Sequence, residues 1–393
     1  MNVPDEIPRS LYGSPLRDLD RWTSAQYIES AEFDGAERYP LAEPEEVPDV
    51  RFLRRQDRVW RPNDYDELTP TQCAPPGYTL LRDVQILPGG LTLAADGRFV
   101  KDDRTRLTPP TVWPAFARFI AAGPEGRLTW PVAPQAIKKG ILASGPGSNV
   151  YGHQLLDYLP GLALLEQVGA FADWPVLLRQ GAPSWVIPMI EEFVGRRREI
   201  KVIPGGRARL RTDVGQLCVP WVVRSPSLHP IVRKVFSRIV EAAKAEGDEP
   251  VEASSRKLYV VRGEGDDGSE KRRLINRAQV EGLFTARGFE LIRPELLSFK
   301  DQVRLFAGAE VVAGEGGSGL HGVIFSAEGS VTLELRPASY KMLAQPAIAI
   351  LQRQTFASVM GVDAVDEGQE GQAWPPWTLE LEALEERLAE LEL

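Results

Sequence analysis

The stretch from Val311 to Phe325, VVAGEGGSGLHGVIF, constrains the fold more than any other part of the chain. Apolar residues that favour strands precede a glycine-rich turn at Gly314–Gly319, and an apolar segment with helical spacing follows at once. This order predicts a strand, a tight turn and the start of a helix. Glycine lets backbone N–H groups converge on an anion, and the helix dipole favours negative charge there. The turn therefore predicts a phosphate site, although a turn that binds nothing can have the same pattern.

Short runs that predict strands alternate with segments that predict helices over the last third of the chain. The strand-like runs are KLYVVR at 257–262, FELI at 289–292, EVVA at 310–313 and VTLEL at 331–335. Asn276 and Ser298 are predicted to cap two of the helices between them. This alternation predicts a parallel, Rossmann-like sheet. Ligands of such sheets bind at the carboxyl ends of the strands, where Arg262, the Gly314–Gly319 turn and Glu334 are expected.

Changes in sequence pattern predict four segments in a chain of 393 residues, which is long enough for two domains. Residues 1–76 are rich in Pro, Arg and acidic residues and predict an irregular arm. Residues 77–246 begin with short antiparallel strands and continue as an α/β domain, and residues 247–361 hold the Rossmann-like sheet. Residues 362–393 form an acidic tail with a short amphipathic helix. We expect this helix to pack on the body or on a second copy of the chain in a homodimer.

A histidine and an aspartate lie four residues apart in SNVYGHQLLDYLPGLA at 148–163. The leucine spacing predicts a helix, so His153 and Asp157 should share one helical face. A histidine oriented by a carboxylate can act as a general base toward a hydroxyl group. The same spacing also suits a hydrogen bond that only stabilises the helix, and both readings stay open.

The distribution of charge argues against a nucleic-acid partner. Residues 363–393 carry ten acidic residues and one basic residue, Arg387, so the tail accounts for the whole net charge of −9 and the body is neutral. Proteins that bind nucleic acid usually show a basic excess. A local basic cluster leaves peripheral contact with a membrane open; it comprises Arg196–Arg198, Lys201, Arg207, Arg209 and Arg211.

The cysteines and the hydropathy pattern indicate a cytoplasmic protein, with the inner face of the membrane as the place of any peripheral contact. Cys73 and Cys218 have no metal-binding or redox spacing, which fits a reducing compartment. The N-terminus lacks the basic-then-apolar pattern of a signal peptide. No apolar run reaches the ~18 residues that span a bilayer, so no transmembrane segment is expected.

The glycines also fit a second class of protein. Gly314, Gly316 and Gly319 have the spacing of the dinucleotide fingerprint, and Glu334 follows at the distance expected for a ribose-binding acid. An NAD-binding oxidoreductase is therefore an alternative. Two observations weigh against it: the segment from Leu320 to Ser326 allows only about two helical turns, and no residues for hydride transfer are visible.

The order of the motifs resembles glycosyltransferase family 61 over about residues 75 to 345. The residues that carry the resemblance are Asn149, His153, Asp157 and Pro160; Lys257–Arg262; Arg272–Asn276; Gly288 and Phe289; Ser298, Phe299 and Gln302; Gly317–Leu320; and Leu333–Leu335. The resemblance implies an α/β, GT-B-like fold with two Rossmann-like domains and a cleft between them. It also implies an inverting enzyme that takes a sugar nucleotide as donor and a glycan or polysaccharide as acceptor, of the bacterial surface-polysaccharide type.

The resemblance assigns roles to individual residues. The expected donor-binding residues are Arg262, Arg273, Asn276, Gly317, Ser318, Gly319, His321 and Glu334. Arg262 would contact the diphosphate and Glu334 the ribose hydroxyls, while His153 and Asp157 would face the acceptor as base and orienting partner. No metal or other cofactor is expected, because no Asp-x-Asp motif accompanies these residues and cationic side chains would balance the leaving group.

Two positions depart from the family pattern. Members usually carry a histidine where this chain has Gly316, and often an asparagine where it has Gly322. Loss of one preorganised donor typically lowers turnover by about 10²–10³-fold. The sequence therefore predicts a slow enzyme with near-normal nucleotide binding, and a gain in turnover for Gly316→His if the backbone tolerates a Cβ. A catalytically inactive relative that binds glycan or nucleotide is the alternative.

Overall fold

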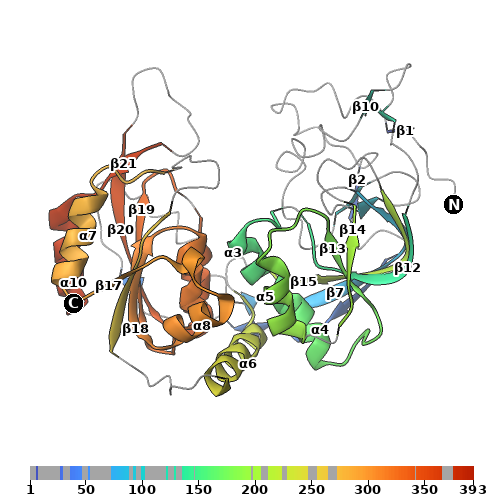
Figure 1. The fold of residues 1–393 in the computed structure, drawn as a ribbon, viewed down its shortest axis with the longest axis horizontal. Helices are drawn as coiled ribbons and strands as arrows, with labels where there is room; N and C mark the ends of the chain where they lie inside the picture. Colours follow the sequence, from blue (N-terminus) through green and yellow to red (C-terminus); the bar gives the residue numbers. More distant parts are fainter. Residues whose placement is uncertain are drawn as a thin grey trace. The chain divides into compact units, whose positions relative to one another are not determined.

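The structure is a computed structural model that describes residues 6–7, 27–29, 36–46, 52–53, 72–87, 92–93, 99–101, 121–122, 128–129, 135–145, 147–195, 198–204, 211–223, 228–246, 255–263, 272–340, 342–364 and 375–393. They form a mixed α/β protein with two compact units (Figure 1). Unit 1 comprises residues 1–43 and 75–223, and unit 2 comprises residues 44–74 and 224–393. Most of the predicted arm at 1–76 lies outside the described residues. Its described parts are short strands that join sheets of both units.

Unit 1 is built on a mixed sheet of nine described strands in the order β14-β13-β12-β15-β7-β8-β9-β2, with β3 also paired to β7. The strands are β2 (Tyr27–Glu29), β3 (Ala36–Pro40), β7 (Gly77–Ile86), β8 (Thr92–Leu93), β9 (Phe99–Lys101), β12 (Gln135–Leu142), β13 (Val176–Arg179), β14 (Ile200–Ile203) and β15 (Thr212–Trp221). Strands β12 to β15 run parallel, whereas β7, β8 and β9 pair antiparallel. The predicted antiparallel strands after Tyr78 are therefore confirmed.

The predicted helix around His153 is present but contains a π-helical turn. The helical segments are α3 (Tyr151–His153), η3 (Gln154–Tyr158), α4 (Leu159–Gln167) and α5 (Val186–Val194), of which η3 is the π turn. Pro160 lies in the first turn of α4 and has no N–H to donate to the carbonyl of Leu156, which explains why the regular α-helical pattern breaks just before it. Leu155, Leu156 and Leu159 are completely buried, as the spacing predicts.

Unit 2 contains the predicted parallel sheet, in the order β17-β16-β18-β19-β20-β21, with β5 paired to β20. The strands are β5 (Phe52–Leu53), β16 (Arg256–Val260), β17 (Glu290–Ile292), β18 (Ala309–Glu315), β19 (Val331–Pro337), β20 (Thr355–Asp363) and β21 (Trp377–Thr378), and only β21 runs antiparallel to its neighbour. The chain passes from β16 outward to β17 and then returns to β18 on the other side of β16. The strand order therefore reverses between β16 and β18, and this is the place where open α/β sheets bind ligands.

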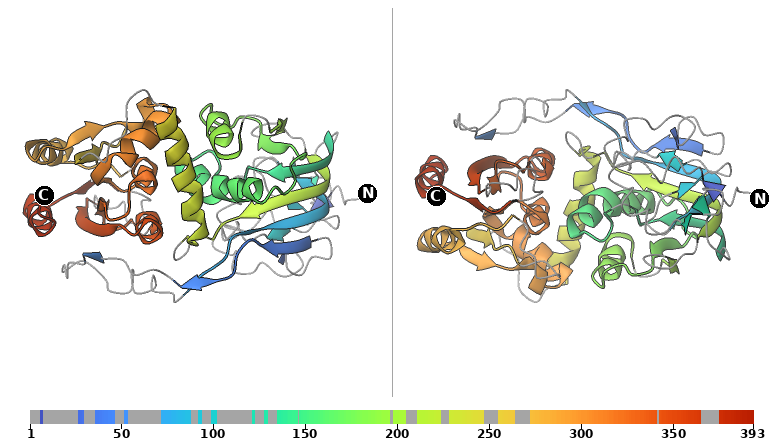
Figure 2. Two further views of the ribbon diagram at one scale, coloured as in Figure 1. Left: turned by 90° about the horizontal axis from the view of Figure 1, so that it is seen from below. Right: turned by 90° about the horizontal axis from the view of Figure 1, so that it is seen from above.

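Helices cover both faces of this sheet (Figures 1 and 2). Helices α7 (Arg277–Ala286) and α10 (Leu381–Glu390) lie on one side, and α8 (Phe299–Ala307) lies on the other with η5 (Ser318–Phe325) and α9 (Ala344–Gln352). A short 3₁₀ turn, η4 (Pro294–Leu296), precedes α8. Leu384 and Leu388 of α10 belong to the core of unit 2. The tail helix therefore packs on the body, as predicted, and gives no argument for a homodimer.

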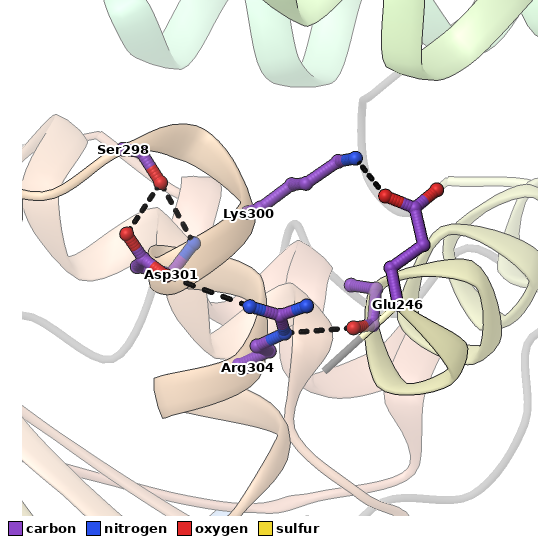
Figure 3. A network of polar contacts seen from close by, with 6 residues as sticks. Glu246, Ser298, Lys300, Asp301 and Arg304 are labelled. Atoms are coloured by element: carbon purple, nitrogen blue, oxygen red, sulfur yellow. Dashed lines mark hydrogen bonds and ion pairs between the residues drawn. The ribbon is translucent and has the colours of Figure 1, made fainter. Parts of the chain in front are cut away.

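Helix α6 (Ile231–Ala245) belongs to unit 2, so the units separate after Val223 and not after residue 246 as predicted. Polar contacts join α6 to α8 (Figure 3). Arg304 Nε donates to the carbonyl of Ala243 at 2.7 Å, and Lys300 pairs with Glu246. At the other end of α6, the buried His229 accepts the N–H of Ile231 through Nδ1 at 3.2 Å. His229 thus has a structural role.

Of the two predicted helix caps, one is present and one is not. Ser298 caps α8 as predicted, because its Oγ accepts the N–H of Asp301 at 3.2 Å. Asn276 precedes α7, but its side chain does not cap the helix.

Three further sheet pairings involve very short strands. β1 (Glu6–Ile7), β10 (Ala121–Ala122) and β11 (Leu128–Thr129) form one sheet, and β4 (Glu45–Glu46) pairs with β6 (Gln72–Cys73).

Candidate functional site

Two arginines of unit 2 converge on one backbone carbonyl at the point where the strand order reverses. Arg262 follows β16 and Gly316 follows β18, so both lie at the carboxyl ends of adjacent parallel strands. Arg262 Nη1 donates to the Gly316 carbonyl oxygen at 3.2 Å, and Arg272 Nη1 donates to the same oxygen at 2.8 Å. A guanidinium group has five N–H donors, and among the described residues this carbonyl is the one hydrogen-bond acceptor of Arg262. The pair can therefore accept an anionic ligand.

The electrostatics of this arginine pair favour an anion. Burial lowers the pKa of Arg262, and the positive charge of Arg272 lowers it further. The carboxylate of Glu315 is nearby, but Arg277 already binds it, with Nε at 2.9 Å from Oε1. Two like charges held close together in a partly dry site are costly unless a counter-charge arrives. A diphosphate would supply that charge and would accept several hydrogen bonds at once.

A buried carboxyl group lies beside the same turn. Glu334 on β19 is 0 % exposed, and neither of its carboxyl oxygens has a hydrogen-bond partner among the described residues. Burial raises its pKa to about 7, an effect that the positive charge of Arg336 partly offsets. Arg336 Nη1 lies 3.7 Å from Glu334 Oε2, and the Arg336 guanidinium also donates to the carbonyl of Tyr340. A carboxyl group this deeply buried whose oxygens lack hydrogen-bond partners is typical of a site that binds a ligand.

Glu334 also explains why position 316 is glycine. A Cβ on Gly316 would lie 2.6 Å from Glu334 Oε1 and 2.9 Å from Tyr340 Cε1, which is too close for either. The backbone of Gly316 is not left-handed, so the constraint is contact and not torsional strain. The sequence predicts higher turnover for Gly316→His only if a Cβ is tolerated at position 316, and in this structure a side chain there would have to displace Glu334 or Tyr340. Gly322 is constrained in the same way, since its Cβ would lie 2.1 Å from the Phe306 ring.

The raised pKa of Glu334 leads to a prediction for stability. An acid whose pKa rises from 4.5 when unfolded to about 7 when folded binds more protons in the folded state between these values. The stability from this group is complete below pH 4.5 and is lost as the pH rises through 7, a change of about 3 kcal/mol in the free energy of unfolding. Glu334→Gln should remove this dependence. Urea unfolding of both proteins should give equal free energies of unfolding at pH 4.5 and a larger value for the variant at pH 8. The same change in the free energy of unfolding between the two pH values in both proteins would contradict the raised pKa of Glu334.

The segment after the glycine turn is a 3₁₀ helix, η5, where the sequence predicts an α-helix. Its first N–H groups, those of Ser318 and Gly319, have no acceptors within the helix and are available to a ligand by position. Gly317 lies against the arginine pair, because a Cβ there would be 2.7 Å from Arg262 Nη1. His321 is buried, and its Nδ1 lies 2.9 Å from Gln345 Nε2, which also donates to the Gly317 carbonyl. Nδ1 is therefore an acceptor, and His321 serves to hold the turn against α9.

The structure places Arg273 and Asn276 at a different feature. Asn276 Nδ2 donates to the carbonyl of Leu379, and the Leu379 N–H donates to Asn276 Oδ1. The Arg273 side chain is exposed, and its carbonyl accepts the Trp377 N–H at 2.9 Å. Both residues thus fasten the segment around β21 to the sheet. The arginine that reaches Gly316 is Arg272, which the sequence analysis missed.

In unit 1, the predicted pair of His153 and Asp157 is formed. His153 Nδ1 lies 2.6 Å from Asp157 Oδ2, and the two side chains are 28 % and 23 % exposed. Gly147, which has a left-handed backbone with φ of 76°, packs against the ring, because a Cβ there would lie 2.8 Å from His153 Cδ2. The pair follows β12 at the carboxyl edge of the parallel strands, and the hydrogen bond leaves Nε2 as the ring nitrogen that a substrate can meet.

The predicted basic cluster of unit 1 is largely structural or lies outside the described residues. Arg196, Arg197, Arg207 and Arg209 lie outside them. Arg198 binds Glu166 and donates to the carbonyls of Phe171 and Trp174. No helix in the described part of the chain is long and apolar enough to cross a membrane. Nor do the described residues contain a group of three His, Cys, Asp or Glu side chains placed to hold a metal ion.

Comparison with known proteins supports the family that the motifs suggested. Residues 151–333 match the family model described as Glycosyltransferase 61. The matched part contains His153, Asp157, Arg262, Arg272 and the Gly314–Gly319 turn, so it spans the candidate residues of both units except Glu334. The match supports a relation to glycosyltransferase family 61. It therefore also supports glycosyltransferase activity in general, which requires a sugar donor and an acceptor. No curated protein matches the chain.

Proposed function

We propose that this protein is an inverting glycosyltransferase that moves a sugar from a sugar nucleotide to a glycan or polysaccharide acceptor in the cytoplasm. The convergence of Arg262 and Arg272 on Gly316 O carries the proposal. The family match to residues 151–333 supports the class of reaction. In this proposal, the units divide the work as in a GT-B-like enzyme: unit 2 binds the donor and unit 1 binds the acceptor.

The arginine pair stabilises the leaving group. When the bond between the anomeric carbon and the β-phosphate oxygen breaks, the bonding electrons leave with the nucleoside diphosphate, whose negative charge grows. Arg262 and Arg272 are held in place before the reaction, so they stabilise this charge without reorganising. Backbone N–H groups of Ser318 and Gly319 add further donors. Glu334 accepts hydrogen bonds from the ribose hydroxyls, which would give its carboxyl oxygens the hydrogen-bond partners that they lack.

The His153 and Asp157 pair prepares the acceptor. Asp157 accepts the proton on Nδ1, so the lone pair lies on Nε2 and can take the proton of the attacking hydroxyl. The hydroxyl oxygen then forms the new bond to the anomeric carbon on the face opposite the leaving diphosphate. The configuration at that carbon inverts, and the proton ends on His153.

Gly316 bears on the rate of this reaction. Where relatives usually carry a histidine, this chain presents a backbone carbonyl to two arginines and has no room for a side chain. We propose that cationic stabilisation passes to Arg262 and Arg272 and that turnover is lower than in a site with a further donor. The same observation favours the second candidate function, a catalytically inactive relative that binds the nucleotide.

Thermal denaturation with a panel of nucleotides tests the proposal. Ligand at 100 times its dissociation constant should add about 2.7 kcal/mol to the free energy of unfolding. We expect at least one nucleoside diphosphate to raise the melting temperature, and the nucleoside lacking phosphates to have no effect. Stabilisation by NAD and by no nucleoside diphosphate would contradict the proposal and support the dinucleotide alternative.

A further inference from the structure

Arg179 is a second cationic group at the carboxyl edge of a parallel sheet, in unit 1. It is the last residue of β13, and its N–H donates to Ser144 Oγ at 3.0 Å, just beyond the end of β12. The side chain is half-buried. Among the described residues, no carboxylate pairs with its guanidinium, and the buried Nε has no hydrogen-bond partner.

A comparison within unit 1 shows why this arrangement is unusual. Arg198 is also buried, but it binds Glu166 and two backbone carbonyls, so its charge and donors are satisfied. Burial lowers the pKa of Arg179, and the contribution of Tyr158 in the other direction is smaller. Holding an unpaired guanidinium in a partly buried position costs folding free energy. A ligand that brings a negative charge would offset that cost.

The loop after β12 connects Arg179 with the histidine pair. It begins at Ser144, which contacts Arg179, and ends at α3. Gly145 packs against Tyr158, because a Cβ there would lie 2.6 Å from the Tyr158 hydroxyl, and Gly147 packs against the His153 ring. The loop thus lies against both Tyr158, the neighbour of Arg179, and the proposed base. Any group bound at Arg179 belongs to the same edge of the sheet as His153.

We propose that Arg179 forms an oxyanion subsite in unit 1 that binds a carboxylate or phosphate group carried by the acceptor. A guanidinium donates two parallel N–H bonds to either group, and such charge-assisted hydrogen bonds are about twice as strong as those between neutral groups. The identification of the ligand as the acceptor rests on the proposed function, whereas binding of the anion itself does not. The acceptor class is then acidic: a glycan that bears a uronic acid, or one that bears a phosphate.

Calorimetric titration of small anions tests the subsite without any transfer reaction. The protein should carry both Arg262→Gln and Arg272→Gln, so that binding at unit 2 does not mask the result, and the probes are glucuronate, inorganic phosphate and uncharged glucose. We expect glucuronate or phosphate to bind and glucose not to bind. Arg179→Gln should weaken the anion by about 10- to 150-fold, the loss of a charge-assisted bond. A preference for glucuronate indicates a carboxylate-bearing acceptor, and a preference for phosphate indicates a phosphorylated one.

Matched variants keep the result interpretable. Arg82→Gln removes an exposed arginine of the same unit, which pairs with Glu37, and should leave anion affinity unchanged. Should Arg179→Gln fail to fold, Arg179→Lys keeps the charge but loses the paired donors and should weaken binding by about tenfold. Unchanged anion affinity in the Arg179 variants, or an equal loss in Arg82→Gln, would overturn the proposal. Nucleoside diphosphate binding to the protein with Arg262 and Arg272 intact is measured separately, so failure of the proposed function is distinguishable from failure of the subsite.

Discussion

Replacing His153 with alanine is expected to lower sugar transfer by about 10²–10⁴-fold, the usual contribution of a positioned general base. In the proposed mechanism Nε2 takes the hydroxyl proton, since Nδ1 is held by Asp157 at 2.6 Å. Nucleotide affinity should not change, because the pair lies in unit 1 and the arginine pair that we propose binds the diphosphate lies in unit 2. The measurement is the initial rate of nucleoside diphosphate release with acceptor present, together with the dissociation constant of the nucleotide.

Asp157→Asn provides the matched variant for this prediction. An amide keeps the size of the side chain but no longer favours the proton on Nδ1, so the rate should fall while the helix stays intact. If the pair only stabilised the helix, both variants would lower the melting temperature and leave the rate per folded molecule unchanged. That outcome would contradict a catalytic role for His153 and Asp157 and would show that the pair stabilises the helix.

Removing both Arg262 and Arg272 is expected to weaken nucleoside diphosphate binding by about 10²–10⁴-fold. Each charge-assisted contact is worth about 1.5–3 kcal/mol, or about 10- to 150-fold in affinity. Each single variant should therefore lose about 10- to 150-fold in affinity, and the range for the double variant is the product of the two losses. Binding of the nucleoside without its phosphates should not change, which assigns the loss to the diphosphate.

Arg273→Gln is the control for this experiment, because it removes the same charge from the neighbouring position. The Arg273 side chain is exposed, and the Arg273 backbone carbonyl accepts a hydrogen bond from the N–H of Trp377. Its affinity for the nucleotide should equal that of the unaltered protein. A large loss in Arg273→Gln with none in Arg272→Gln would contradict the assignment of Arg272 to the diphosphate.

Much of unit 2 could be predicted from sequence because its strands and connections carry local signals. The runs at 257–262, 310–313 and 331–335 became parallel neighbours, and Ser298 caps α8 as its spacing indicates. The type of helix after the glycine turn could not be predicted. Gly322 of this helix packs closely against Phe306 of α8, a contact with a different helix that no local pattern reveals.

The candidate site was predictable in part for the same reason. Arg262 lies at a strand end, which a strand pattern locates, and its contact with Gly316 follows from two adjacent strands. Arg272, and not Arg273, reaches Gly316, and its backbone is left-handed with φ of 61°, a conformation that is uncommon for residues other than glycine, asparagine and aspartate. The need for glycine at 316 depends on Glu334 from another strand. The residues next to Arg272 and Gly316 in the sequence indicate neither the position of the Arg272 side chain nor the need for glycine at position 316.

Phosphorus NMR of the protein incubated with a panel of sugar nucleotides tests the central claim most directly. Transfer of the sugar to an acceptor or to water converts the diphosphate ester into a free nucleoside diphosphate, whose terminal phosphate has its own resonance. We predict that one sugar nucleotide is converted, slowly, and that the double replacement of Arg262 and Arg272 abolishes the conversion at the same concentration. A protein that binds a nucleoside diphosphate at these arginines but converts no sugar nucleotide, with acidic and neutral glycans present as acceptors, would contradict the claim that it is a glycosyltransferase.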